Sequence, residues 1–104
     1  MRIVMVGAGY VGLVSGACLA DFGHEVVCVE VDESKVIGLR EGRVPIYEPG
    51  LSELVMHNQR AGRLTFVAAD EDDAYETALN EAEFIFIAVS TPTFPGSDLS
   101  LIHI

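Results

Sequence analysis

Three glycines near the start of the chain constrain its fold more than any other feature. They are Gly7, Gly9 and Gly12, at the spacing G-x-G-x-x-G. Residues 2–6 come before them as a short apolar run rich in β-branched side chains, which indicates a buried parallel strand. Residues 11–22 follow with small and apolar side chains and predict a helix packed on a sheet. The chain therefore passes from a strand to a helix through a glycine turn.

Each glycine of this turn has a physical role at a nucleotide site. Gly7 allows the tight turn, Gly9 lets a pyrophosphate approach the backbone, and Gly12 lets the helix pack closely on the strand. The N–H groups and the positive dipole end of the helix then face the phosphates. A second predicted strand, residues 25–30, ends on Glu30. An acid about 20 residues beyond the glycines is expected to bind a ribose hydroxyl, so the sequence predicts a dinucleotide site.

Two other interpretations of this stretch stay open. One is a glycine-rich turn in an α/β domain that binds no ligand. The other is a secretory signal, because Arg2, a long apolar stretch and the sequence S-G-A-C at 15–18 resemble a lipoprotein cleavage site. The glycines would weaken the apolar helix that such a signal needs, and the strand that ends on Glu30 would be unexplained. We favour the dinucleotide site.

Composition limits which partners the protein can have and in which compartment it is expected. Half of the 104 residues are hydrophobic, enough for one domain with its own core, and no apolar run is long and glycine-free enough to span a membrane. The net charge of −10 argues against nucleic acid or an anionic membrane as partner. Cys18 and Cys28 fall in a predicted helix and strand, where we expect two buried small hydrophobes. Without metal-ligand spacing or a secretory signal, they are typical of a reduced cytoplasmic protein.

The remaining chain continues the alternation of strands and helices. Predicted strands at 63–67 and 83–89 alternate with predicted helices at 33–41, 51–61 and 70–80. The strand at 83–89 is apolar throughout, which predicts a central position in the sheet. The fold class is therefore α/β, a Rossmann-like parallel sheet with flanking helices. Four strands are too few for a complete doubly wound domain, so we expect an incomplete domain, truncated after the fourth strand.

Polar residues are expected to mark the helix ends. Asp32 is a predicted N-cap, and Gly42 is a predicted stop for the same helix. The four acids at 70–73 are interpreted as N-caps and as partners of the helix dipole rather than as a metal site. Lys35 lies in a first turn beside the expected ribose. It is either a solvated surface lysine or a contact to the cofactor.

Two loops carry further candidates. Residues 43–50, R-V-P-I-Y-E-P-G, form either a plain connector or an ordered loop that touches substrate. Residues 90–93, S-T-P-T, follow the fourth strand, and ligands of open α/β sheets bind outside the carboxyl ends of strands. These hydroxyls either bind cofactor or substrate or form a turn. Residues 99–104 are interpreted as a non-native tail, because their codons match a transposase adaptor, which leaves 1–98 as the domain.

Four motifs together resemble a known family. G-A-G-Y-V-G-L, V-E-V-D-x-x-K, P-I-Y-E-P-G-L and S-T-P-T occur here in the order typical of the N-terminal part of nucleotide-sugar dehydrogenases, the UDP-glucose/GDP-mannose dehydrogenase family. The resemblance covers residues 1–95, and Y-E-P-G-L is similar to the UDP-glucose branch. That family oxidises a sugar C6 alcohol to a carboxylate in two hydride transfers to NAD. The resemblance implies NAD as cofactor, UDP-glucose or a related nucleotide sugar as substrate, and a cytoplasmic homo-oligomer for the full-length protein.

The same resemblance assigns residues to the two ligands. It implies that the cofactor lies against Gly7, Gly9, Tyr10, Val11, Gly12, Glu30, Lys35, Thr91 and Thr93, and the substrate side against Tyr47, Glu48 and Leu51. Glu30 stands where the family usually has aspartate. The family's catalytic cysteine, lysine and glutamate lie beyond this chain, so we expect no catalytic residue in it and no activity of the chain alone. An NAD-sensing module that performs no chemistry is the alternative.

Overall fold

The computed structural model describes residues 1–45 and 48–88 of the chain. Its strands are β1 (Arg2–Val6), β2 (Glu25–Glu30), β3 (Leu64–Ala68) and β4 (Phe84–Ile87). Its helices are α1 (Tyr10–Asp21), α2 (Glu33–Arg40), α3 (Leu51–Arg60) and α4 (Asp72–Glu81). These bounds agree closely with those predicted from the sequence, because apolar periodicity indicates the elements and a glycine follows shortly after helices α1, α2 and α3.

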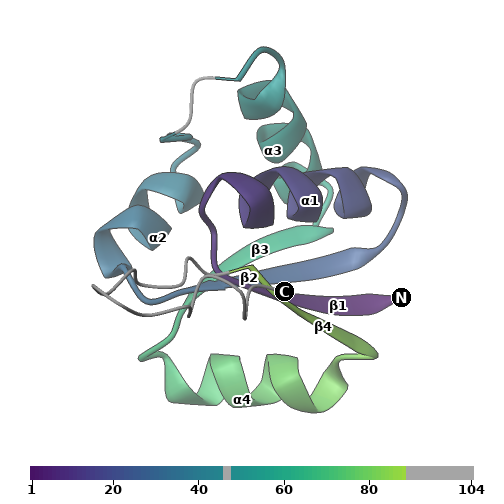
Figure 1. Ribbon diagram of the computed structural model, residues 1–104, viewed down its shortest axis with the longest axis vertical. Helices are drawn as coiled ribbons and strands as arrows, with labels where there is room; N and C mark the ends of the chain where they lie inside the picture. The colour runs from purple at the N-terminus through teal and green to yellow at the C-terminus, as the bar shows by residue number, and fades with distance from the viewer. Residues whose placement is uncertain (46–47, 89–104) are drawn as a thin grey trace, which may run out of the picture.

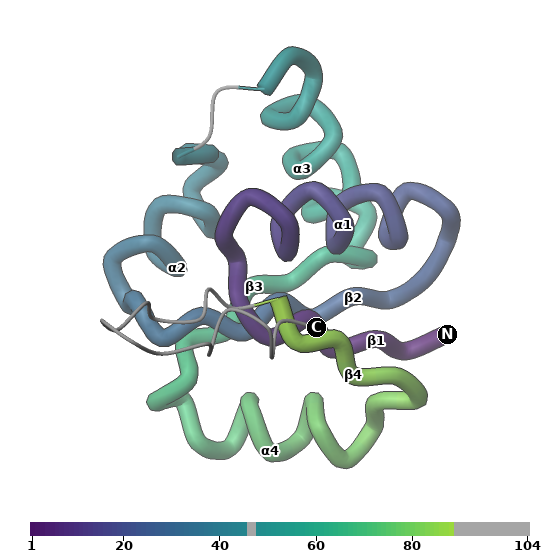
Figure 2. The backbone as a smooth tube through the Cα atoms, viewed as in Figure 1, coloured from purple at the N-terminus to yellow at the C-terminus, as the bar shows by residue number. Residues whose placement is uncertain are grey.

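The strands form one parallel sheet in the order β3-β2-β1-β4. Helices α1, α2 and α3 cover one face of the sheet, and α4 covers the other (Figure 1). The tube in Figure 2 shows that the chain leaves β1 and β2 at the same edge. The α/β prediction of a Rossmann-like sheet is therefore confirmed. Because all strands run the same way, the residues that follow β1, β2 and β3 gather at one edge, where ligands of such sheets bind.

The core lies between the sheet and the three helices above it. Its largest fully buried side chains include Phe66 and Met5 from the strands and Leu13 and Leu39 from the helices. Each such side chain contributes about 1.5–3 kcal/mol through removal from water. Gly16 lets α1 approach β2, because a Cβ there would stand 3.0 Å from Sγ of Cys28. The buried side chains that stabilise the fold thus lie on the face of the sheet that α1, α2 and α3 cover.

Two of the three predicted helix-end features are present. The Asp32 side chain caps α2 by accepting a hydrogen bond from the backbone N–H of Lys35 at 3.3 Å, and Gly42 follows the helix at φ +87°. The N-cap prediction for the acids before α4 is wrong. Glu71 occupies the N-cap position but makes no capping bond, because its carboxylate accepts from Ala68 N–H at 3.0 Å and from Arg40 at 2.8 Å. The acids that open α4 remain near its dipole.

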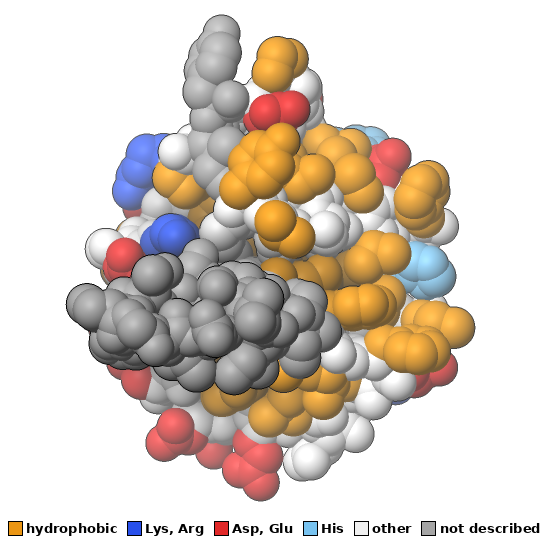
Figure 3. Space-filling model, viewed as in Figure 1, with side chains coloured by type: hydrophobic (Ala, Val, Ile, Leu, Met, Phe, Trp, Pro, Cys, Tyr) orange, Lys and Arg blue, Asp and Glu red, His pale blue; other side chains and the backbone are white. Residues whose placement is uncertain are grey.

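Strand β4 departs from the sequence prediction of a central strand. Within the described residues it pairs with β1 alone, and its four side chains are each about half exposed. A groove of about 540 Å³ separates it from Val11, Ser15 and Cys18 of α1. Figure 3 shows several hydrophobic side chains exposed on the face that Figure 1 presents. A continuous apolar pattern reports that both faces are suited to burial, and it does not fix the place of the strand in the sheet.

This edge predicts self-association of the 104-residue chain. Unpaired strand edges with apolar side chains template pairing between molecules, and a lysine on such an edge suppresses it. We expect Ile85→Lys to raise the concentration at which the chain stays monomeric by about tenfold. Sedimentation velocity over a concentration series measures this. Phe22→Lys, at an apolar residue 80% exposed after α1, is the control and should leave association unchanged. Equal effects of both changes would assign the association to general surface hydrophobicity.

Candidate dinucleotide site

The glycine turn connects β1 to α1 through a contact that only glycine permits. Gly7 adopts φ +103°, a conformation that residues with a side chain rarely adopt, and its N–H donates to the carbonyl of Val29 at 2.7 Å. A Cβ on Gly12 would overlap the carbonyl oxygen of Gly7. The first turn of α1 therefore lies directly against the end of β1. The predicted roles of these two glycines in the turn are confirmed.

Gly9 differs from the other two, because the chain itself does not require glycine there. Its backbone is extended, with φ −77° and ψ −165°, which any residue adopts. A Cβ built on it would meet no atom within 4 Å. The open space beside Gly9 is therefore room that the protein leaves unfilled at the start of a helix. The space lies beside the positive N-terminal end of α1, the kind of position at which proteins bind phosphate groups.

The carboxylate of Glu30 joins the glycine turn to the end of β2. Its Oε1 accepts from the N–H of Ala8 at 3.2 Å, and its Oε2 accepts from the N–H of Asp32 at 2.9 Å. Nζ of Lys35 lies 3.5 Å from Oε1. Burial raises the pKa of this carboxyl, but the two backbone bonds and the Lys35 charge outweigh it, and the pKa is lowered. Glu30 is therefore ionised and fixed, with lone pairs left for ribose hydroxyls.

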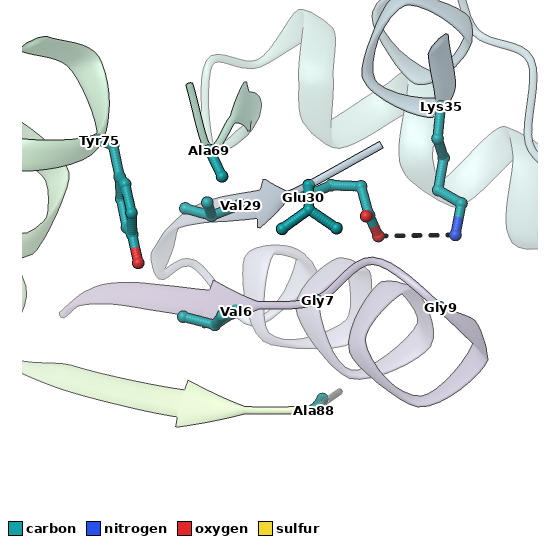
Figure 4. A pocket seen from close by; sticks show the side chains of 10 residues that line it. Val6, Gly7, Gly9, Val29, Glu30, Lys35, Ala69, Tyr75 and Ala88 are labelled. Atoms are coloured by element: carbon teal, nitrogen blue, oxygen red, sulfur yellow. Dashed lines mark ion pairs between the residues drawn. The ribbon is translucent and has the colours of Figure 1, made fainter. Parts of the chain in front are cut away.

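These groups line a cleft of about 320 Å³ at the carboxyl ends of β1 and β2. Figure 4 shows Gly9 and Lys35 on one side of it, Tyr75 on the other, and Glu30 between them. Four predicted cofactor residues are thus brought together, namely Gly7, Gly9, Glu30 and Lys35. Sequence reasoning missed Tyr75, which comes from α4. No motif marks it, because helix α4 follows the third strand and approaches the cleft only through the fold.

Other predicted site residues lie around the cleft rather than in its lining. Tyr10 and Val11 begin α1 with exposed side chains, and Tyr10 Oη donates to a carboxylate oxygen of Glu48 at 3.4 Å. Leu51 begins α3 with its side chain buried in the core. Tyr10 and Glu48 join the start of α1 to the loop before α3. The predictions for Tyr47, Thr91 and Thr93 fall outside the described residues.

The two cysteines differ, and the prediction that both are buried is half wrong. Cys28 is fully buried in β2, and burial raises its pKa to about 12, so it is held as a thiol. Cys18 is exposed, because it lies on the side of α1 that faces the groove beside β4.

Across residues 1–45 and 48–88, no three His, Cys, Asp or Glu side chains gather as metal ligands. Over the same residues, every helix is too short or too polar to cross a membrane.

The fold and the cleft define a class, that of dinucleotide-binding α/β domains. The family model of the UDP-glucose/GDP-mannose dehydrogenase family, NAD binding domain, matches residues 1–103. The chain therefore belongs to this family as its NAD-binding domain, and the resemblance drawn from the motifs is confirmed. NAD is the cofactor of that domain, and the open space at Gly9 and the ionised Glu30 are compatible with it.

Individual relatives agree with this membership. The UDP-glucose 6-dehydrogenase of Rhizobium meliloti is 51% identical over 106 residues, which are 99% of this chain and 23% of that protein. The GDP-mannose 6-dehydrogenase of Pseudomonas aeruginosa is 38% identical, and its ternary-complex structure matches 98% of this chain and 23% of its own with a TM-score of 0.83. The UDP-glucose dehydrogenase structure from Pyrobaculum islandicum is 41% identical, with a TM-score of 0.78 over 89% of this chain and 20% of its own. The chain thus spans less than a quarter of these relatives' length.

The contrast between Gly9 and Gly12 yields a paired prediction. Gly9→Val should leave the free energy of unfolding within about 1 kcal/mol of the original, because its backbone is unstrained and its Cβ meets nothing. It should weaken NAD binding at least tenfold by filling the phosphate space. Gly12→Ala should destabilise the fold by about 1–3 kcal/mol through overlap with Gly7. Urea unfolding and calorimetric titration with NAD separate the two effects. Unchanged NAD affinity in Gly9→Val would contradict the assignment.

Glu30 predicts the choice between NAD and NADP. Its anion would repel a 2′-phosphate on the ribose, so we expect NAD to bind at least tenfold more tightly than NADP. Glu30→Ala should narrow that ratio and also destabilise the fold, because the N–H groups of Ala8 and Asp32 lose their acceptor. Glu33→Ala, which removes a nearby charge from the first turn of α2, is the control and should keep the ratio. Equal binding of both cofactors by the unmutated chain would refute the prediction.

Proposed function

We propose that this chain is the NAD-binding part of an enzyme that oxidises the C6 alcohol of UDP-glucose to the carboxylate of UDP-glucuronate with two NAD. The observation that supports the NAD-binding part of this proposal is the cleft in which the glycine turn and the fixed Glu30 carboxylate meet. The choice of UDP-glucose as substrate rests on the sequence P-I-Y-E-P-G-L. It also rests on the identity to proteins named UDP-glucose 6-dehydrogenase, which is higher than the identity to the GDP-mannose 6-dehydrogenase. In this proposal the whole protein is a cytoplasmic homo-oligomer.

In this proposal each residue at the cleft has a binding role. The N–H groups after Gly9 hold the pyrophosphate, Glu30 accepts from the adenosine ribose, and Lys35 neutralises charge beside it. Bound NAD supplies the acceptor for a hydride. Thr91 and Thr93 are assigned to the nicotinamide side. Tyr47, Glu48 and Leu51 are assigned to the substrate side, with Leu51 contributing through its position in the core and Glu48 through its bond to Tyr10.

The chain's own cysteines do not suit the nucleophile that a two-step oxidation to a carboxylate uses. Such a step needs a thiolate that reaches the aldehyde carbon. Cys28 is a buried thiol within β2, and Cys18 faces the groove beside β4 rather than the cleft. The catalytic groups in this proposal therefore come from sequence outside this chain.

A dehydrogenase for another nucleotide sugar is the second candidate. It is favoured by the structural match to a GDP-mannose dehydrogenase, which is at least as good as the match to a UDP-glucose enzyme. A Pyrococcus horikoshii structure described as a UDP-D-ManNAc dehydrogenase matches equally well at 27% identity. An NAD-sensing module without chemistry is the third candidate. It would use the same cleft but none of the groups assigned to the substrate side.

Domain exchange tests the proposal. Residues 1–88 of this chain would replace the corresponding segment of the Rhizobium meliloti UDP-glucose 6-dehydrogenase and, separately, of the Pseudomonas aeruginosa GDP-mannose 6-dehydrogenase. We expect the first hybrid to form NADH with UDP-glucose within about tenfold of its parent, and the second to be at least tenfold weaker relative to its own parent with GDP-mannose, because the loop sequence P-I-Y-E-P-G-L resembles the UDP-glucose branch. The reverse order would favour the second candidate. Two folded, NAD-binding but inactive hybrids would favour the sensing module.

A further inference from the structure

Tyr75 is the one aromatic side chain among the described residues that line the cleft. It comes from α4, the helix on the opposite face of the sheet from α1 and α2 (Figures 1 and 4). It is half-buried, and its hydroxyl end points toward the cleft between β1 and β2 in the close view. Neither the glycine turn nor Glu30 depends on it. We propose that Tyr75 is the platform on which the adenine ring of the dinucleotide stacks, an inference that rests on the proposed cofactor site.

The order of groups along the cleft carries this assignment. Gly9 and the start of α1 lie at one side, and Glu30 lies between them and Tyr75 (Figure 4). In a dinucleotide the adenosine ribose separates the pyrophosphate from the adenine. With phosphate beside Gly9 and ribose hydroxyls on Glu30, the base extends toward the side that Tyr75 and Ala69 form. A nicotinamide lies beyond the pyrophosphate, on the other side of the glycine turn.

The chemistry of that side suits a flat aromatic base. Val29 and Ala69 give it apolar walls, and the Tyr75 ring adds a π-face with a polar end. Every nucleobase has a π-face, so a base of any kind can stack on an aromatic side chain. The side chain of an aliphatic residue at this position would offer area but no such stacking.

The backbone that carries the Tyr75 ring is held in place before a ligand arrives. The N–H of Tyr75 donates to the carbonyl of Glu71 at 2.9 Å, at the start of α4. The Glu71 carboxylate binds Arg40 at 2.8 Å and the N–H of Ala68 at 3.0 Å, so this end of α4 is tied to α2 and β3. An aromatic platform on a fixed helix end loses little conformational entropy when a base stacks on it.

Binding of two fragments of the cofactor, one with the adenine and one without it, tests the proposal. ADP-ribose contains the adenine, and nicotinamide mononucleotide does not. Calorimetric titration would be run on the 104-residue chain below the concentration at which it self-associates. We expect Tyr75→Ala to weaken ADP-ribose binding about tenfold and to leave nicotinamide mononucleotide binding unchanged. Tyr75→Phe should keep ADP-ribose affinity within about twofold, because the π-face remains. Phe22→Ala, an aromatic truncation outside the cleft, should change neither.

A spectroscopic readout separates stacking from a structural role. The chain has three tyrosines and no tryptophan, so its fluorescence comes from tyrosine. We expect ADP-ribose to quench part of that fluorescence and Tyr75→Phe to remove most of the quenching while binding persists. Quenching that survives in Tyr75→Phe, or undiminished ADP-ribose binding by Tyr75→Ala, would overturn the role of Tyr75 and leave the cofactor site standing. Failure of the unmutated chain to bind ADP-ribose would overturn both.

Discussion

The backbone contact between Gly7 and Gly12 determines where everything else at the ligand edge can lie. Because Gly12 has no Cβ, the first turn of α1 rests against the carbonyl of Gly7, and the helix starts as close to β1 as a backbone allows. That closeness aims the N–H groups of the helix end at the space beside Gly9. The same contact lets α1 cover β1 and β2 and bury Leu13 and Ala17 in the core. The absence of a side chain at Gly12 is therefore needed both for the position of the helix end at the candidate site and for the packing of the core.

Glu30 makes that turn rigid from the opposite side. Its two oxygens accept from the backbone N–H groups of Ala8 in the glycine turn and of Asp32 before α2, and Lys35 balances its charge. A carboxylate in this setting is both a structural brace and a recognition group, because the bonds that fix it also keep it ionised. The longer glutamate side chain spans the distance from the end of β2 to Ala8. In the proposed site, the residue assigned to the ribose thus also fixes the loop assigned to the phosphates.

The sequence predicts local and periodic features well and spatial ones less well. Strand and helix bounds, the Asp32 cap and the grouping of Gly7, Gly9, Glu30 and Lys35 follow from periodicity, cap chemistry and the common edge of parallel strands. The edge position of β4, the exposure of Cys18 and the place of Tyr75 do not follow. Each depends on which elements become neighbours in the fold, and the local residue pattern does not determine that. Apolar residues predict burial, but they do not say what covers them.

Strand order also has a consequence for the time course of folding. The last strand of the described sheet lies next to the first, with Ile3 opposite Phe84 and Val6 opposite Ile87. During synthesis, β1 can pair with β2, and β2 with β3, while β4 is still unmade. One edge of β1 therefore remains unpaired until almost all of the described residues have left the ribosome. Closing that long loop is the step of highest contact order, so docking of β4 is expected to limit the rate at which the sheet is completed.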